Sequence, residues 1–163
     1  MLKKIYTTLF LFLICHNVQA KNLEHIFEDW HVLTSSKEQD KICYIVAVPK
    51  EESGNYTNRS KAYLVVSKFK DREPEISISG GYPYQLGSEI ELLIKNQPYF
   101  LRKIEGELAW AENSDTDKII INAMKAGSVV DAKATSTKGT YSIDTYSLMG
   151  FTKSYSKMLE LCK

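Results

Sequence analysis

The stretch GTYSIDTYSLMGFTKSYSKMLELCK, residues 139–163, decides the fold, because a hydroxyl-rich strand pattern runs directly into an amphipathic helix pattern. The large apolar side chains of its first half change parity midway: Tyr141 and Ile143 share one face, and Tyr146 and Leu148 share the other. A β-bulge would cause this change, and so would a strand buried on both faces. We therefore expect the stretch to begin with an irregular or doubly buried strand.

Asp144 lies where the inward face changes, and no histidine is near it in the sequence. A buried carboxylate must find hydrogen-bond donors. We predict that Asp144 is a structural residue that accepts hydrogen bonds from nearby backbone N–H groups or hydroxyls. Tyr146 is predicted to be a structural residue of the same strand.

The second half of the stretch predicts a helix that begins near Thr152. Tyr155, Met158, Leu159 and Cys162 follow the i, i+3, i+4, i+7 spacing of one helix face. Cys162 therefore points toward the core.

Residues 1–20 have the pattern of a cleaved secretory signal, with Lys3 and Lys4 before an apolar run and Ala20 at the expected cleavage site. A transmembrane anchor is the alternative, but the run is much shorter than the roughly 20 apolar residues of a span. Acylation at Cys15 is a second alternative, and the bulky Ile14 before it argues against this. We expect one domain over residues 21–163, with no transmembrane span after the signal is removed.

Cys43 and Cys162 are the two cysteines that remain after cleavage. An even count in an exported protein favours a disulfide. Two separate buried thiols are the alternative.

The middle of the chain reads as strands separated by turns. Alternating apolar and polar residues indicate half-buried strands, and more continuous apolar runs indicate central ones. The alternating runs are EISIS at 75–79, EIELLIK at 89–95 and VVDAKATST at 129–137; the continuous runs are ICYIVAV at 42–48 and AYLVVSKF at 62–69. The polar segment 51–60 is predicted to be an exposed loop.

A first helix is predicted from Ser114, which can cap it, to Gly127, which stops it. Asp117 lies at the position of a capping-box partner, and the apolar face is expected to hold Ile119, Ile120, Ala123 and Met124. Many short strands with two helices predict a mainly β protein, a β-sandwich, with a small β-barrel as the runner-up.

The sequence contains no strong catalytic, metal-binding or nucleotide-binding motif. His25 and His31 fit no metal-binding motif, and no hydrolase or nucleotide-binding signature is present. Glu89 and Glu91 share a strand face, which alternation predicts to be a solvated outer face. We expect no enzymatic activity, no cofactor and no metal.

Charge argues against a nucleic-acid partner. Removal of residues 1–20 takes Lys3 and Lys4 from the 21 basic residues and nothing from the 20 acidic ones, which leaves 19 against 20 and a net charge of −1. Nucleic-acid binding normally requires a basic surface.

Several aromatic residues fall near expected turns and strand ends: Tyr82, Tyr84, Tyr99, Phe100 and Trp110. Such residues close the ends of sandwich cores. They are also enriched in protein interfaces. We keep both interpretations, with Tyr82, Tyr84, Tyr99 and Trp110 as the candidate partner-binding residues.

The chain resembles the invasion-associated locus B family. The stretches that carry the resemblance are FEDWHV, SKAYLVV, GGYPYQLGSEIELLI, AWAENSDTDKIIINAMKAGS and STKGTYSIDTYSLMGFTKSYSKMLELC. They span roughly residues 27–162, and AMKAGS and GTYSIDTYSLMGFT are the most specific. Many members have a cysteine four residues after the early tryptophan, where this chain has Thr34 after Trp30.

The resemblance implies an exported bacterial protein with an immunoglobulin-like β-sandwich, linked in some pathogens to entry into host cells, and no established enzymatic activity. We therefore expect a periplasmic or secreted binding module, with association with the outer membrane as a further option. Its expected partner is a protein in the envelope or on the host surface. The alternative is a periplasmic housekeeping protein that supports envelope assembly or stress tolerance.

Overall fold

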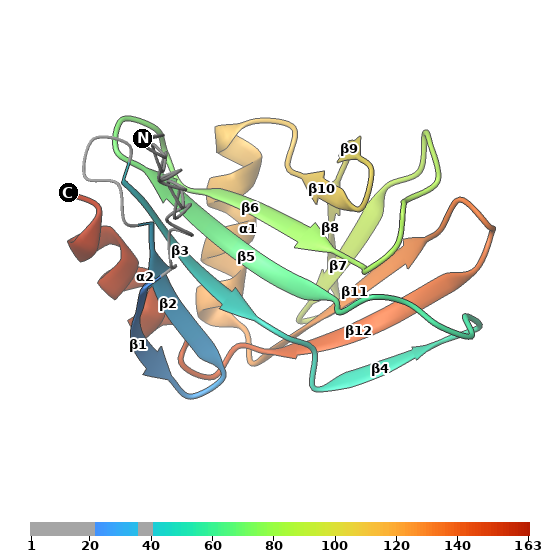
Figure 1. Cartoon of the computed structure of the whole chain (residues 1–163), viewed down its shortest axis with the longest axis horizontal. Helices are drawn as coiled ribbons and strands as arrows, with labels where there is room; N and C mark the ends of the chain where they lie inside the picture. The colour runs from blue at the N-terminus through green and yellow to red at the C-terminus, as the bar shows by residue number, and fades with distance from the viewer. Residues whose placement is uncertain (1–21, 36–40) are drawn as a thin grey trace, which may run out of the picture.

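The computed structural model describes residues 22–35 and 41–163 of the chain, so the expected signal peptide and its cleavage site lie outside the described residues. The described part is mainly β, with two helices (Figure 1). Its elements are β1 (Asn22–Phe27), β2 (Trp30–Thr34), β3 (Ile42–Ala47), β4 (Glu51–Gly54), β5 (Tyr63–Phe69), β6 (Glu75–Ser79), β7 (Ile90–Ile94), β8 (Gln97–Leu101), β9 (Lys103–Glu105), β10 (Leu108–Trp110), α1 (Ser114–Ala126), β11 (Val129–Thr135), β12 (Tyr141–Ser147) and α2 (Phe151–Leu161).

The strands form two antiparallel sheets. The seven-stranded sheet has the order β1-β2-β3-β5-β6-β10-β9, and the five-stranded sheet has the order β4-β12-β11-β7-β8. Among the described strands neither sheet closes on itself, which confirms the predicted β-sandwich over the alternative closed barrel. No helix in the described ranges is long and apolar enough to cross a membrane.

The core lies between the sheets and under the helices, and its strands follow the predicted alternation. In β7, Ile90, Leu92 and Ile94 are all at most 1% exposed. The continuous apolar runs became β3 and β5, which pair with each other inside the larger sheet. Period-two alternation was therefore a good guide to the inward face, because successive strand side chains point to opposite faces.

The predicted disulfide is present. Cys43 on β3 is bonded to Cys162, the C-cap residue of α2, with 5.8 Å between their Cα atoms and 119 residues between them in sequence. Tyr155 and Leu159 pack against the core and Met158 is buried, so the inward face of α2 is the predicted one. The bond fastens this helix to the larger sheet.

The predicted irregularity at Asp144 is wrong. β12 pairs with β11 without interruption over residues 141–147 and with β4 over residues 142–145. Its inward face holds Ser142, Asp144 and Tyr146, while Tyr141 and Ile143 face outward. The strand is regular because polar groups inside the sandwich form hydrogen bonds with the inward side chains of Ser142 and Asp144.

Two details of α1 differ from prediction. The N-cap is Asn113, one residue earlier than Ser114, and its side-chain oxygen accepts a hydrogen bond from Thr116 N at 3.0 Å. Ile119 is 58% exposed, and the buried apolar residues of the helix are Ile120, Ile121 and Met124. Gly127 ends the helix as predicted.

The segment 51–60 is only partly the predicted loop. Its first residues form β4, an exposed edge strand that pairs with β12. Every residue of β4 faces solvent, so no apolar alternation marked it in the sequence.

Candidate functional site

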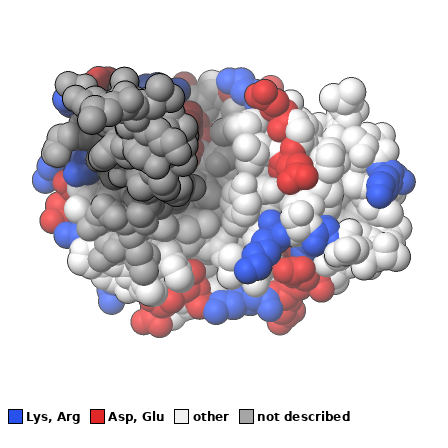
Figure 2. Space-filling model, in the orientation of Figure 1, with Lys and Arg blue, Asp and Glu red and all other residues white. Residues whose placement is uncertain are grey.

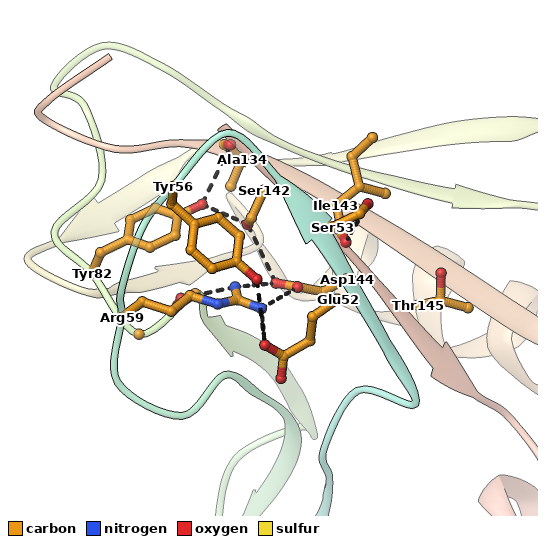
Figure 3. A network of polar contacts seen from close by, with 12 residues as sticks. Glu52, Ser53, Tyr56, Arg59, Tyr82, Ala134, Ser142, Ile143, Asp144 and Thr145 are labelled. Atoms are coloured by element: carbon orange, nitrogen blue, oxygen red, sulfur yellow. Dashed lines mark hydrogen bonds and ion pairs between the residues drawn. The ribbon is translucent and has the colours of Figure 1, made fainter. Parts of the chain in front are cut away.

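A buried ion pair joins the loop after β4 to the inward face of β12 (Figure 3). The Arg59 guanidinium donates to both carboxylate oxygens of Asp144, with Nη1–Oδ2 at 2.7 Å and Nη2–Oδ1 at 2.5 Å. Both side chains are only 3% exposed. A two-pronged arginine–carboxylate contact fixes the orientation of both groups as well as their distance.

Further contacts hold Arg59 from other directions. Its Nη1 donates to the carbonyl oxygen of Gly80 at 3.1 Å, and its Nη2 lies 2.8 Å from Glu52 Oε2. The ring of Tyr56 lies against the guanidinium, 4.6 Å from Cζ to the ring centroid. Burial acts to lower the pKa of Arg59, but the hydrogen bonds and charges of Asp144 and Glu52 outweigh it and raise the pKa, so the group stays charged.

Tyr82 extends the network across the two sheets. Its hydroxyl lies 2.7 Å from Ser142 Oγ and donates to the carbonyl oxygen of Ala134 at 3.3 Å. Ser142 Oγ in turn donates to Asp144 Oδ2 at 3.4 Å. Burial raises the pKa of Tyr82, with the Ser142 hydrogen bond opposing it, so the phenol is neutral at physiological pH.

These contacts occupy Asp144 on both oxygens. The structural role predicted for it stays a prediction, but its main partner is the Arg59 guanidinium and not a backbone N–H group. Tyr146 is fully buried next to it on β12, and burial raises the pKa of its hydroxyl. The geometry is that of a clamp that holds residues 55–60 against the sandwich.

Sequence reasoning missed Arg59, because its polar loop carries no motif and its partner lies 85 residues away. The glycine pair at 80–81 was the available signal. Gly81 has φ +74°, and a Cβ there would lie 2.1 Å from the carbonyl oxygen of Ser60. Only glycine permits this close approach of the two backbones, which brings Arg59 within reach of Gly80.

The four aromatic residues predicted to bind a partner occupy different environments. Tyr84 is only 2% exposed and packs edge-on against Tyr82, which is 9% exposed. Tyr84 therefore belongs to the core and cannot contact a partner, and Tyr82 is mostly core as well. Tyr99 is half-buried against the core.

Trp110 lines a surface groove of about 720 Å³ between α1, β6 and the β9–β10 hairpin. Ala109 is fully buried, so strand alternation turns Trp110 to the outer face of the larger sheet. The groove is lined by two basic side chains, Arg72 and Lys103, and by four acidic ones, Glu73, Glu75, Glu105 and Asp117.

Asp117 on α1 also lines this groove. β10 ends at Trp110, opposite Ser77, so Ile76 has no partner residue on that strand. The Asp117 carboxylate accepts a hydrogen bond from Ile76 N at 2.8 Å in its place. Burial raises the pKa of Asp117, and the Ile76 N–H partly opposes this.

The remaining candidates do not come together into a site. Glu89 is exposed and binds Arg102, with 2.8 Å between Oε2 and Nε. His25 lies 5.8 Å from Phe27 between ring centroids, and both His25 and His31 are exposed. Within the ranges that the structure describes, no three His, Cys, Asp or Glu side chains are placed to hold a metal ion.

The fold and these contacts define a disulfide-bonded, two-sheet β-sandwich with a buried ion pair at one end. The model of the invasion associated locus B (IalB) protein family matches residues 30–159, most of the chain, and the protein belongs to this family. The comparison with curated proteins and the comparison with solved structures each returned no match.

Proposed function

We propose that the protein is an exported, non-enzymatic binding module that contacts a protein partner on the host-cell surface. Family membership over residues 30–159 and a disulfide of the kind found outside the cytoplasm support export and a role in host interaction. The observation that carries the binding role is the Trp110 groove. A tryptophan in the same groove as Arg72 and Lys103 combines residue types that dominate the binding energy of protein interfaces or rim them.

The charges of the groove add selectivity. Four carboxylates against two cations give the groove an acidic excess, which favours a partner with basic side chains at the contact. On the face shown in Figure 2, acidic and basic side chains are interspersed. The proposed partner therefore recognises a local site and not a broad field of one sign.

Binding of the labelled, purified protein to host cells tests the proposal. Trp110→Ala should reduce binding at least tenfold, because buried interface tryptophans typically contribute about 2 kcal/mol or more. Met149→Ala is the matched control, since Met149 is 59% exposed and does not line the groove. Equal binding by wild type and Trp110→Ala, with both folded, would contradict the assignment of the groove.

The alternative is a periplasmic housekeeping protein. Protease added to intact bacteria separates the two functions, because a protein that contacts host cells must be accessible from outside or released. Complete protection on intact cells, with no protein in the medium, would favour the housekeeping function.

A further inference from the structure

Four chain segments meet at the end of the sandwich opposite α2 (Figure 1). They are 56–60, 81–83, the β9–β10 turn at Glu107, and 136–140. Backbone hydrogen bonds join them in pairs: Ser60 N to Gly81 O at 3.0 Å, Thr137 N to Pro83 O at 3.0 Å, and Tyr84 N to Gly106 O at 2.9 Å. The segments thus form one connected surface.

These segments enclose a groove of about 330 Å³ that shares no lining residue with the Trp110 groove. Its volume is near the lower end of the roughly 300–1,000 Å³ range of small-molecule sites. Loops held on a rigid scaffold are the usual place for such sites.

Arg59 links this groove to the buried ion pair. Its side chain lines the groove although it is only 3% exposed. Its Nε has no hydrogen-bond partner among the described residues, which leaves a buried donor unused. Such a buried, unpaired N–H group is costly.

The lining combines flat apolar surfaces with neutral hydrogen-bonding groups. Tyr56 and Pro83 supply ring surfaces, with a small part of Tyr82, and Asn58, Ser60 and Thr137 supply an amide and hydroxyls. The hydroxyls of Ser136 and Thr140 also line the groove and lie 2.7 Å from each other. Sugars need both kinds of contact, because a pyranose has an apolar C–H face and a rim of hydroxyls that donate and accept.

Charge narrows the ligand class. The carboxylates of Asp144 and Glu52 outweigh the charge of Arg59, and Lys138 and Glu107 on the groove wall carry opposite charges. The groove therefore has no excess positive charge to attract a phosphate or a sialic acid. We propose that it binds the neutral end of a carbohydrate chain, at a site held in shape by the Arg59–Asp144 pair.

Saturation-transfer NMR of the purified exported protein with neutral mono- and disaccharides tests this inference, with sialic acid and inorganic phosphate as charged comparators. At least one neutral sugar should receive saturation. The double variant Asn58→Ala/Lys138→Ala should weaken its binding about tenfold, because it removes two hydrogen-bonding side chains. Both residues are exposed, so the variant should keep the wild-type melting temperature.

Lys133→Ala is the matched control, because Lys133 is an exposed lysine on β11 outside the groove. It should bind the sugar like wild type, and so should Trp110→Ala, so this test is independent of the protein-binding groove. The inference is overturned if no neutral sugar binds, if only sialic acid or phosphate binds, or if the double variant binds as tightly as Lys133→Ala.

Discussion

The two ends of the sandwich are held together by opposite means. At the α2 end, the Cys43–Cys162 bond and apolar packing close the core, with Trp30 and Phe151 in an edge-on contact at 4.9 Å. At the other end, the buried charges of Arg59 and Asp144 lie between the loops and β12. The first arrangement resists unfolding through chain constraint and burial of apolar surface.

The second arrangement is a poor source of net stability, because removing two charges from water offsets much of their attraction. Its contribution is to geometry, because it fixes the position of residues 56–60 at the edge of a groove. The comparison suggests a division in which the disulfide end sets stability and the ion-pair end sets the geometry of a binding surface. Five variants of the chain examine this division, beginning with the largest expected loss of stability.

Arg59→Ala should have the largest effect, a loss of about 3–5 kcal/mol in the free energy of unfolding, because it leaves the Asp144 carboxylate buried without its cation. Urea denaturation measures the loss. Asp144→Ala should cost less, about 1–3 kcal/mol, since Arg59 keeps Glu52 and the carbonyl of Gly80 as partners.

The double variant Arg59→Met/Asp144→Leu separates stability from geometry. It removes both charges and fills their space with apolar side chains. Its free energy of unfolding should therefore lie within about 1 kcal/mol of the wild-type value. It should nevertheless lose the sugar binding proposed above. A double variant as unstable as Arg59→Ala would show that the ion pair itself stabilises the fold, and the proposed division would be wrong.

Cys162→Ser should lower the free energy of unfolding by about 2–4 kcal/mol, the typical contribution of a disulfide. The bond encloses a long loop, so the unfolded chain gains much freedom when it is lost. Thermal melts with and without reductant provide the measurement, and reduced wild type should match the variant. Sugar binding at the far end should be unchanged while the variant is folded; a loss there would mean that the two ends are not independent.

Asp117→Asn should change the free energy of unfolding the least, and it should raise it where the other single substitutions lower it. Asp117 is a buried carboxylate that accepts from a backbone N–H group and, unlike Asp144, has no ion-pair partner among residues 22–35 and 41–163. Its pKa is raised on folding, so the native state holds the proton more tightly than the unfolded chain. In wild type this group therefore lowers stability progressively as pH rises from about 4 through its native pKa.

The asparagine keeps the acceptor for Ile76 N and removes the charge, so the variant should be slightly more stable than wild type at pH 7. The difference in stability should vanish near pH 3, where the Asp117 carboxyl group is protonated in both the folded and the unfolded state. Urea denaturation from pH 3 to pH 7 measures the difference. A variant less stable than wild type at neutral pH would mean that the Asp117 charge is favourable in the fold.

Much of the architecture could be read from local pattern. The predicted runs at 42–48, 62–69, 75–79, 89–95 and 129–137 correspond to β3, β5, β6, β7 and β11, and both helices begin within one residue of the predicted starts. The cysteine pairing was also accessible, because only two cysteines remained to be joined. Short, polar or exposed strands such as β4 were missed, since an element without a buried face leaves no periodic signal.

The inward face of β12 shows where local pattern fails. Large apolar side chains at Tyr141 and Ile143 suggested one inward parity, but the structure turns Ser142 and Asp144 inward. Side-chain polarity near a strand centre normally marks the outer face. That rule is overridden here because Arg59 and Tyr82 arrive from other loops and satisfy the buried groups.

Periodicity, turn residues and cysteine count are properties of neighbouring residues or of composition, so the sequence alone specified the strands with a buried alternating or continuous apolar run, both helices, the disulfide and the sandwich class. The Arg59–Asp144 clamp and both grooves are assembled from segments that are distant in sequence, with 85 residues between the two charged partners. Whether a buried charge is tolerated depends on which donors surround it in space. Only the packing of the two sheets brings those donors together.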